Sequence, residues 1–76
     1  MATKYVTISN SWKEVNSGAC VCQKRTKKDI LVYVGSSEPD DNSPYGVWRY
    51  GNFAYNGSDK LYAKTRSGDV TLVVFT

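Results

Sequence analysis

The sequence predicts an all-β protein, a small antiparallel β-sandwich with no helices; a small β-barrel is the alternative. Turn-forming residues interrupt the chain at short intervals, and no window of helical length has apolar residues at the i, i+3, i+4, i+7 spacing. Short runs rich in β-branched and aromatic residues lie between the turns. The 76 residues are expected to form one domain, 1–76, with a long polar loop at 35–46.

The first half of the chain contains four candidate strands. They are Lys4–Ser9, Trp12–Val15, Ala19–Gln23 and Ile30–Val34. The first alternates, with Val6 and Ile8 on one face, as in a strand that is buried on one side. Residues 16–18 form a turn, and the charged residues 24–28 form a loop. The fourth candidate is almost continuously apolar, which is typical of a strand covered on both faces.

The second half begins with the polar loop, in which Pro39 and Pro44 exclude regular structure. The candidate strands that follow are Val47–Tyr50, Phe53–Tyr55, Lys60–Thr65 and Val70–Thr76. The last two flank the turn residues 66–69 and are predicted to form a β-hairpin. The final run has almost no charge, so it must be buried inside the domain or against another copy of the chain.

So short a chain buries a small core and needs additional stabilisation. Cys20 and Cys22 are the only cysteines, and residues i and i+2 of a strand lie about 6.5–7 Å apart, at the limit of disulfide geometry. We therefore expect buried free thiols in a reducing compartment. Association with other chains is the favoured source of further stability.

The residue inventory argues against catalysis. The chain has no histidine, so it has neither a histidine general base nor a Ser–His or Cys–His pair. The adjacent carboxylates Asp40 and Asp41 lie in the polar loop, where rigid support is lacking. A weak calcium site from Glu38, Asp40, Asp41 and Asn42 is a less favoured alternative. No enzyme activity, cofactor or metal is expected.

The charged loop contains four candidate ligands for an anion, Lys24, Arg25, Lys27 and Lys28. The whole chain is mildly basic, with a formal charge of +3 and a pI near 9.0. The loop suits weak nucleic-acid binding, contact with an acidic protein, or simple solvation, and we favour solvation.

Aromatic residues concentrate between residues 45 and 55, as they do at protein interfaces. The predicted interface residues are Tyr45, Trp48, Arg49, Tyr50, Val70, Leu72 and Val74, the last three from the terminal strand. Trp12 is expected to pack in the core or at an edge. The specific motifs of RNA-binding sheets and cold-shock domains are missing.

Several motifs follow one another along the chain in a recognisable order. They are Val6-Thr7, Ser9, Trp12, Val15 and Gly18; then Val34-Gly35 with Pro39; then Phe53, Tyr55 and Gly57; and finally Lys60–Thr65 with Gly68 and Thr71–Val74. In this order the chain resembles a group of short bacteriophage proteins encoded among virion structural genes. The two cysteines and the 24–28 run depart from that group.

The resemblance implies a non-enzymatic virion structural protein, a capsid decoration or a tail or fibre accessory. Such a protein acts by oligomerisation, with a homotrimer favoured, and by binding capsid or tail proteins. It is made in the bacterial cytoplasm and resides in the virion; with no secretory signal or long apolar run, we expect no membrane association. The alternatives are a small nucleic-acid-binding β-barrel and a phage-encoded inhibitor of a host protein.

Overall fold

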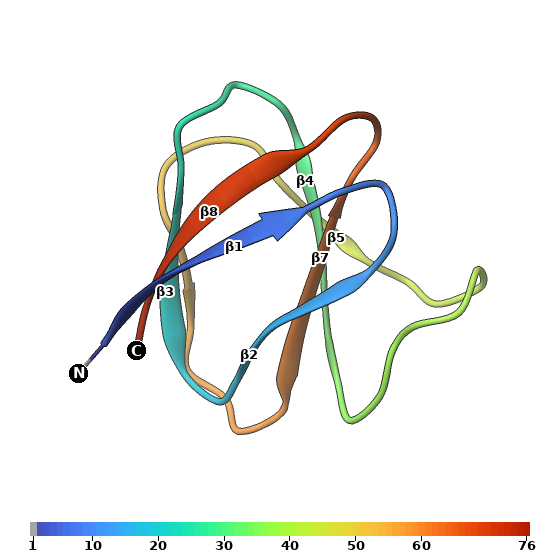
Figure 1. The fold of residues 1–76 in the computed structure, drawn as a ribbon. Coiled ribbons are helices and arrows are strands. Elements are labelled where there is room, and N and C mark those ends of the chain that lie inside the picture. Colours follow the sequence, from blue (N-terminus) through green and yellow to red (C-terminus); the bar gives the residue numbers. More distant parts are fainter. Residues whose placement is uncertain (1) are drawn as a thin grey trace.

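The computed structural model describes residues 2–76, which form eight β-strands and no helix (Figure 1). The strands are β1 (Thr3–Ile8), β2 (Lys13–Ser17), β3 (Cys20–Lys24), β4 (Ile30–Gly35), β5 (Gly46–Trp48), β6 (Phe53–Tyr55), β7 (Lys60–Thr65) and β8 (Val70–Phe75). Two four-stranded antiparallel sheets pack around one core, so the predicted all-β sandwich is confirmed. Over the described residues, no helix is long and apolar enough to span a membrane.

The first sheet has the strand order β1-β8-β3-β6 and the second has the order β2-β7-β4-β5. Only β4 and β5 are both consecutive in the chain and paired with each other; the other connections cross between the sheets. The predicted hairpin of β7 with β8 is therefore wrong. β7 pairs with β2 and β4, while β8 pairs with β1 and β3, so each is an inner strand of its own sheet.

The two ends of the chain lie side by side (Figure 1). β1 pairs with β8 along its whole length, from Thr3 opposite Phe75 to Ile8 opposite Val70. Beyond the strands, the Ala2 amide donates to the Thr76 carbonyl at 3.1 Å and the Thr76 amide donates back at 2.9 Å. The pairing of β1 with β8 therefore cannot form until nearly all of residues 3–75 are available, and such long-range pairing is typical of slow-folding β-proteins.

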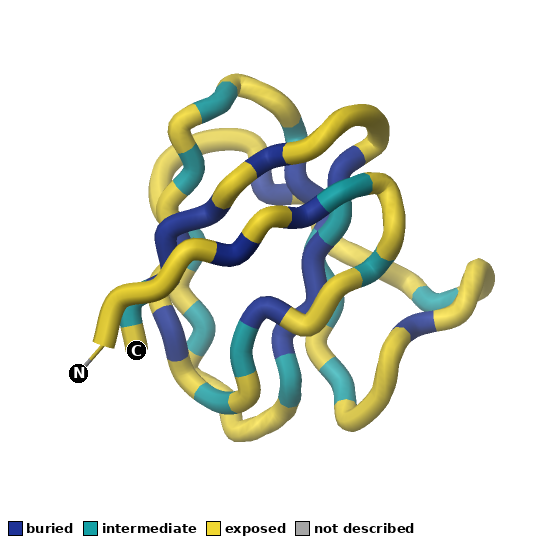
Figure 2. Tube along the Cα trace, viewed as in Figure 1, coloured by how far each residue is buried: buried dark blue, intermediate teal, exposed yellow. Residues whose placement is uncertain are grey.

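The core lies between the sheets and follows the alternation of the strands. Figure 2 shows exposed and buried residues alternating along β1, where Val6 and Ile8 point inward. The inward residues of β8 meet Ile30 and Leu61 of the second sheet in the same apolar cluster. The apolar terminal strand is thus buried within its own domain.

The sheet edges are protected against pairing with another chain. β1 is the longest edge strand, and its Thr7 carbonyl accepts a hydrogen bond from the Lys13 ammonium at 3.2 Å. The β2 edge has a register irregularity between Glu14 and Asn16, and the edges β5 and β6 have three residues each. Lysines, bulges and short strands all disfavour edge-to-edge association, so a partner is expected on a face or an end of the sandwich.

Candidate binding surfaces

Four of the predicted interface residues lie in the core instead. Trp48 is 5% exposed and Leu72 is 1% exposed, and Val70 and Val74 are buried with them. The prediction that these side chains form an interface is wrong. They occupy inward positions of β5 and β8, and the alternation of β8 places Thr71 and Val73 on the outer face in their stead.

Trp48 also fixes the loop that follows it. The indole Nε1 donates to the Gly51 carbonyl at 2.9 Å, and the ring lies 5.7 Å from the Phe53 ring. Gly51 has a φ of 71°, a backbone conformation that glycine adopts without strain. The Lys24 ammonium lies 5.3 Å from the centroid of the Trp48 ring. Trp48 therefore positions the β5–β6 loop and contacts no solvent-facing ligand surface.

The other three predicted interface residues are exposed but lie on two different surfaces. Tyr45 is 50% exposed and packs beside Trp12, with ring centroids 6.2 Å apart. Arg49 and Tyr50 lie in the β5–β6 loop, where Tyr50 is 89% exposed. The structure thus divides the predicted interface into two candidate surfaces.

The first is the aromatic surface, which we define as Trp12, Tyr33 and Tyr45; Tyr62, on the same sheet face, is buried at 6% exposure and supports Tyr33. The aromatic surface lies on the outer face of the second sheet, where Tyr33 of β4 is directly opposite Tyr62 of β7. The ring centroids of Trp12 and Tyr33 are 6.2 Å apart and those of Tyr33 and Tyr62 are 6.3 Å apart. The Lys64 ammonium lies 4.9 Å from the Trp12 centroid. Tilted aromatic pairs of this kind form rigid surfaces suited to protein contacts.

The sequence identifies Tyr45 as an interface residue but does not place Tyr33 on the surface, or Tyr62 on the same sheet face, where it is buried. Trp12 is half-buried and directly precedes the edge strand β2, which agrees with the edge alternative for this residue. Tyr33 and Tyr62 occupy alternate positions from the inward residues of β4 and β7. That alternation was the available signal, but it indicates a common face only when the two strands are known to pair.

The second surface is the basic end, which we define as Lys24 together with loops 25–29, 49–52 and 66–69. These loops lie together at the upper side of the sandwich in Figure 1. Side chains connect them: the Arg49 guanidinium lies 3.8 Å from the Asp29 carboxylate, and the Lys28 ammonium donates to the Ser67 carbonyl at 3.4 Å. The predicted basic loop is thus brought beside Arg49 and Tyr50, and it gains Arg66 from a distant part of the sequence.

Lys24 has a structural role within the basic end. Its ammonium donates to the carbonyls of Lys28 at 2.7 Å, Trp48 at 3.2 Å and Arg49 at 2.6 Å. An ammonium has three protons to donate, so these three carbonyls use its full capacity. Lys24 therefore ties the β3–β4 loop to the β5–β6 loop. Of the four cations in the predicted basic loop, Arg25, Lys27 and Lys28 are left to meet a ligand.

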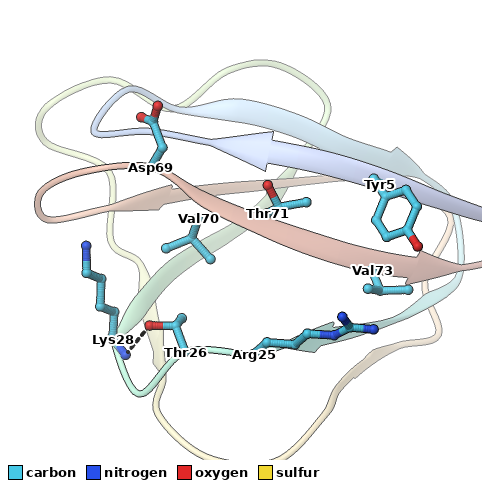
Figure 3. A pocket seen from close by; sticks show the side chains of 8 residues that line it. All are labelled: Tyr5, Arg25, Thr26, Lys28, Asp69, Val70, Thr71 and Val73. Carbon is cyan, nitrogen blue, oxygen red and sulfur yellow. Dashed lines mark hydrogen bonds between the residues drawn. The ribbon is translucent and has the colours of Figure 1, made fainter.

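Two pockets flank the β3–β4 loop. The Tyr5 pocket, of about 440 Å³, is lined by Tyr5, Arg25, Lys28 and the outer residues of β8 (Figure 3). The Tyr50 pocket, of about 480 Å³, is lined by Tyr50, Lys27 and Arg49. Each pocket therefore combines an exposed tyrosine with at least two cationic side chains; Lys24 is a third in the Tyr50 pocket.

The polar loop 35–46 is organised around Asp40. The Asp40 carboxylate accepts hydrogen bonds from the Asn42 amide at 2.9 Å and the Ser43 hydroxyl at 3.0 Å, and Pro39 is buried. Within residues 2–76, no three His, Cys, Asp or Glu side chains are grouped so as to hold a metal ion. The Asp40 carboxylate stabilises the loop's own turn, so the calcium alternative has no structural support.

Cys20 and Cys22 are buried free thiols, as expected, with their sulfur atoms 3.9 Å apart on the inner face of β3. Burial, reinforced by the neighbouring Cys20, raises the pKa of the Cys22 thiol from 9.0 to about 12. A thiol with a raised pKa is a poor nucleophile at neutral pH. The cysteine pair therefore belongs to the core and offers no reactive site.

This raised pKa predicts a loss of stability in alkali. Unfolding lowers the pKa of the Cys22 thiol toward 9.0. Burial of the neutral thiol therefore contributes its full stabilisation of the fold below pH 9.0, and this stabilisation is lost as the pH rises toward about 12. Urea unfolding measured from pH 8 to pH 10.5 should show a steeper fall in free energy for the wild type than for Cys22→Ala. Because Cys22→Ala keeps every tyrosine and lysine, comparison with it removes the effect of their titration. Identical pH profiles of unfolding free energy for the wild type and Cys22→Ala would contradict the buried-thiol assignment.

No family model, curated protein or solved structure matches this chain.

Proposed function

We propose that this chain is a non-enzymatic structural protein of a bacteriophage virion, a capsid decoration or a tail or fibre accessory. It acts by binding copies of itself, with a trimer favoured, and neighbouring capsid or tail proteins. The observation that carries the proposal is the aromatic surface on the outer face of the second sheet. The order of the sequence motifs described above supports the phage assignment and the virion location.

The composition of the aromatic surface suits a protein partner. Tyrosine and tryptophan supply large contact areas at a small cost in side-chain entropy, and they dominate binding energy at interfaces. The pairings among Trp12, Tyr33 and Tyr62 hold the rings in place before a partner arrives. Lys64 adds a charge beside Trp12, and such a polar group at the rim favours one orientation of the partner.

The protected edges support the choice of a face over strand addition. Lys13 occupies the Thr7 carbonyl on β1, and the irregularity in β2 interrupts the other long edge. A neighbouring copy of the chain therefore gains little by extending a sheet. The aromatic surface, next to the edge strand β2, is the contact that remains available for assembly.

A substitution at Tyr45 tests this interface. Tyr45→Ser should leave the fold intact because the side chain is half exposed, and it should weaken self-association by at least about tenfold, as loss of an interface anchor does. Sedimentation velocity over a concentration series measures the effect. Tyr5→Ser is the matched control, since Tyr5 is an exposed tyrosine on the other sheet. Equal association of the two variants would contradict the proposal.

A further inference from the structure

The net positive charge of the chain is concentrated at the basic end. This end carries six of the ten lysine and arginine side chains and two of the seven carboxylates, which gives a local charge of +4. The rest of the chain carries four cations and five carboxylates, which gives −1. The carboxylates at the basic end are Asp29 and Asp69. A charge this unevenly placed attracts polyanions to one end of the molecule.

The Tyr5 pocket is lined by an exposed aromatic ring, an apolar valine and two cationic side chains, Arg25 and Lys28. Figure 3 shows Tyr5 and Arg25 at one end of the pocket, with Lys28 and Asp69 toward the other and β8 running between them. Tyr5 is 73% exposed, so a face of its ring is open to a ligand. Val73, which lies directly opposite Tyr5 in the strand pairing, supplies an apolar floor. The carboxylate of Asp69 directs an anion toward the Arg25 end.

The Tyr50 pocket repeats this combination on the other side of the same loop. Tyr50 is almost fully exposed and shares the pocket with Lys27 and Arg49. Arg49 is paired with Asp29 only loosely, at 3.8 Å, and its side chain remains 62% exposed. Lys24 holds the Arg49 carbonyl, so the backbone that presents Tyr50 is fixed.

We propose that the basic end binds single-stranded nucleic acid, which crosses the β3–β4 loop between the two pockets. Phosphates contact Arg25, Lys27, Lys28 and Arg49, and bases stack on Tyr5 and Tyr50. Stacking on aromatic rings together with a cationic track is the usual way in which proteins hold single strands without sequence preference. Duplexes keep their bases stacked on one another, so the two tyrosines favour single strands.

This site differs from a simple basic patch because each of its two pockets contains both an exposed tyrosine and cationic side chains. An acidic protein would be attracted by the same charges but has no need of an exposed ring in each pocket. Arg66, in the third loop of the basic end, extends the cationic track beyond Lys28. The proposed site lies apart from the aromatic surface, so a virion subunit can hold a protein partner and a nucleic acid together.

Fluorescence anisotropy with 5′-labelled dT20 and rU20 tests the proposal. Binding is expected in 20 mM salt, and four or five phosphate contacts predict a slope of about −3 in a plot of log K against log salt concentration. Affinity should therefore fall about a thousandfold in 200 mM salt. Equal binding of the DNA and RNA strands would indicate that the 2′-hydroxyl is not read and agrees with the proposal. Absence of binding at 20 mM salt would overturn it.

Single charge variants locate the site. Lys27→Gln should weaken binding severalfold and make the salt slope shallower by about 0.7, the contribution of one phosphate contact. Lys60→Gln removes the same charge from β7, away from the basic end, and should leave binding unchanged. Equal effects of the two variants would show that only net charge matters and would overturn the site.

A tyrosine variant separates stacking from charge. Tyr50→Ala should weaken dT20 binding about tenfold while leaving binding of inorganic polyphosphate unchanged, and Tyr50→Phe should bind as the wild type does. An unchanged affinity for dT20 in Tyr50→Ala would overturn the nucleic-acid assignment. A salt-sensitive self-association that Lys27→Gln and Asp41→Asn both weaken would also overturn the nucleic-acid assignment. In that case the polar loop 35–46 of a second copy would occupy the basic end.

Discussion

Replacing Trp48 with alanine should destabilise the domain by about 3–5 kcal/mol, the usual cost of truncating a buried tryptophan. The change empties a core position, removes the Nε1 hydrogen bond to Gly51 and leaves Lys24 without its aromatic neighbour. A domain of this size has a small reserve of stability, toward the low end of about 5–15 kcal/mol. The melting temperature is expected to fall by about 15–30 °C, measured by circular dichroism.

Tyr50→Ala is the matched control for Trp48→Ala. It removes another aromatic side chain two residues away, from a position that is almost fully exposed, and should change stability by less than about 0.5 kcal/mol. If Trp48→Ala folded as stably as the wild type and lost only its assembly, Trp48 would be an interface residue. That result would contradict its place in the core.

Leu72→Ala should cost about 2–5 kcal/mol, because Leu72 is fully buried in an inner strand of the first sheet. The range reflects how far the surrounding side chains can close the cavity. Urea unfolding followed by tryptophan fluorescence measures the loss directly. The midpoint should move to lower urea with little change in slope, since the same surface is exposed on unfolding.

Thr71→Ala, at the adjacent position on β8, separates the two faces of the strand. Thr71 is exposed, and its hydroxyl shares a 2.9 Å hydrogen bond with the Thr7 hydroxyl across the sheet. Its loss should cost at most about 1 kcal/mol. Comparable losses at Thr71 and Leu72 would mean that the strand is covered on both faces by another chain, contrary to the structure.

The strands could be predicted from the sequence because their signals are local. Alternation in Lys4–Ser9 and the glycine and asparagine turns place the strand boundaries within a few residues of those observed. Strand partners could not be predicted in the same way. A short turn such as 66–69 can join two neighbours in one sheet or carry the chain from one sheet to the other.

The burial of residues depends on those partners. The sequence predicts Val70, Leu72 and Val74 at an interface because another copy of the chain can cover a terminal apolar strand. In the structure β1 and β3 flank β8 on both sides, and the inward residues reach the core. Trp48 was misassigned for a similar reason, since aromatic composition alone does not distinguish a core ring from an interface ring.

The basic end shows what folding adds to a local charge pattern. The sequence identified the cations of residues 24–28 but could not place Arg49, Tyr50 or Arg66 beside them, because the connections between the sheets bring those loops together. Nor could it show that Lys24 is fully engaged by three carbonyls. Prediction of such a site requires the topology first and the charges second.

The measurement that tests the proposed function most directly is the molar mass of the wild-type chain, by light scattering on a gel-filtration peak at 150 mM and 500 mM salt. A closed oligomer, with a trimer favoured, is expected at both concentrations because contacts through the aromatic surface are not weakened by salt. A monomer of 8.5 kDa at both concentrations would contradict assembly through this surface. An oligomer at the lower salt alone would contradict it too, since charge would then drive association.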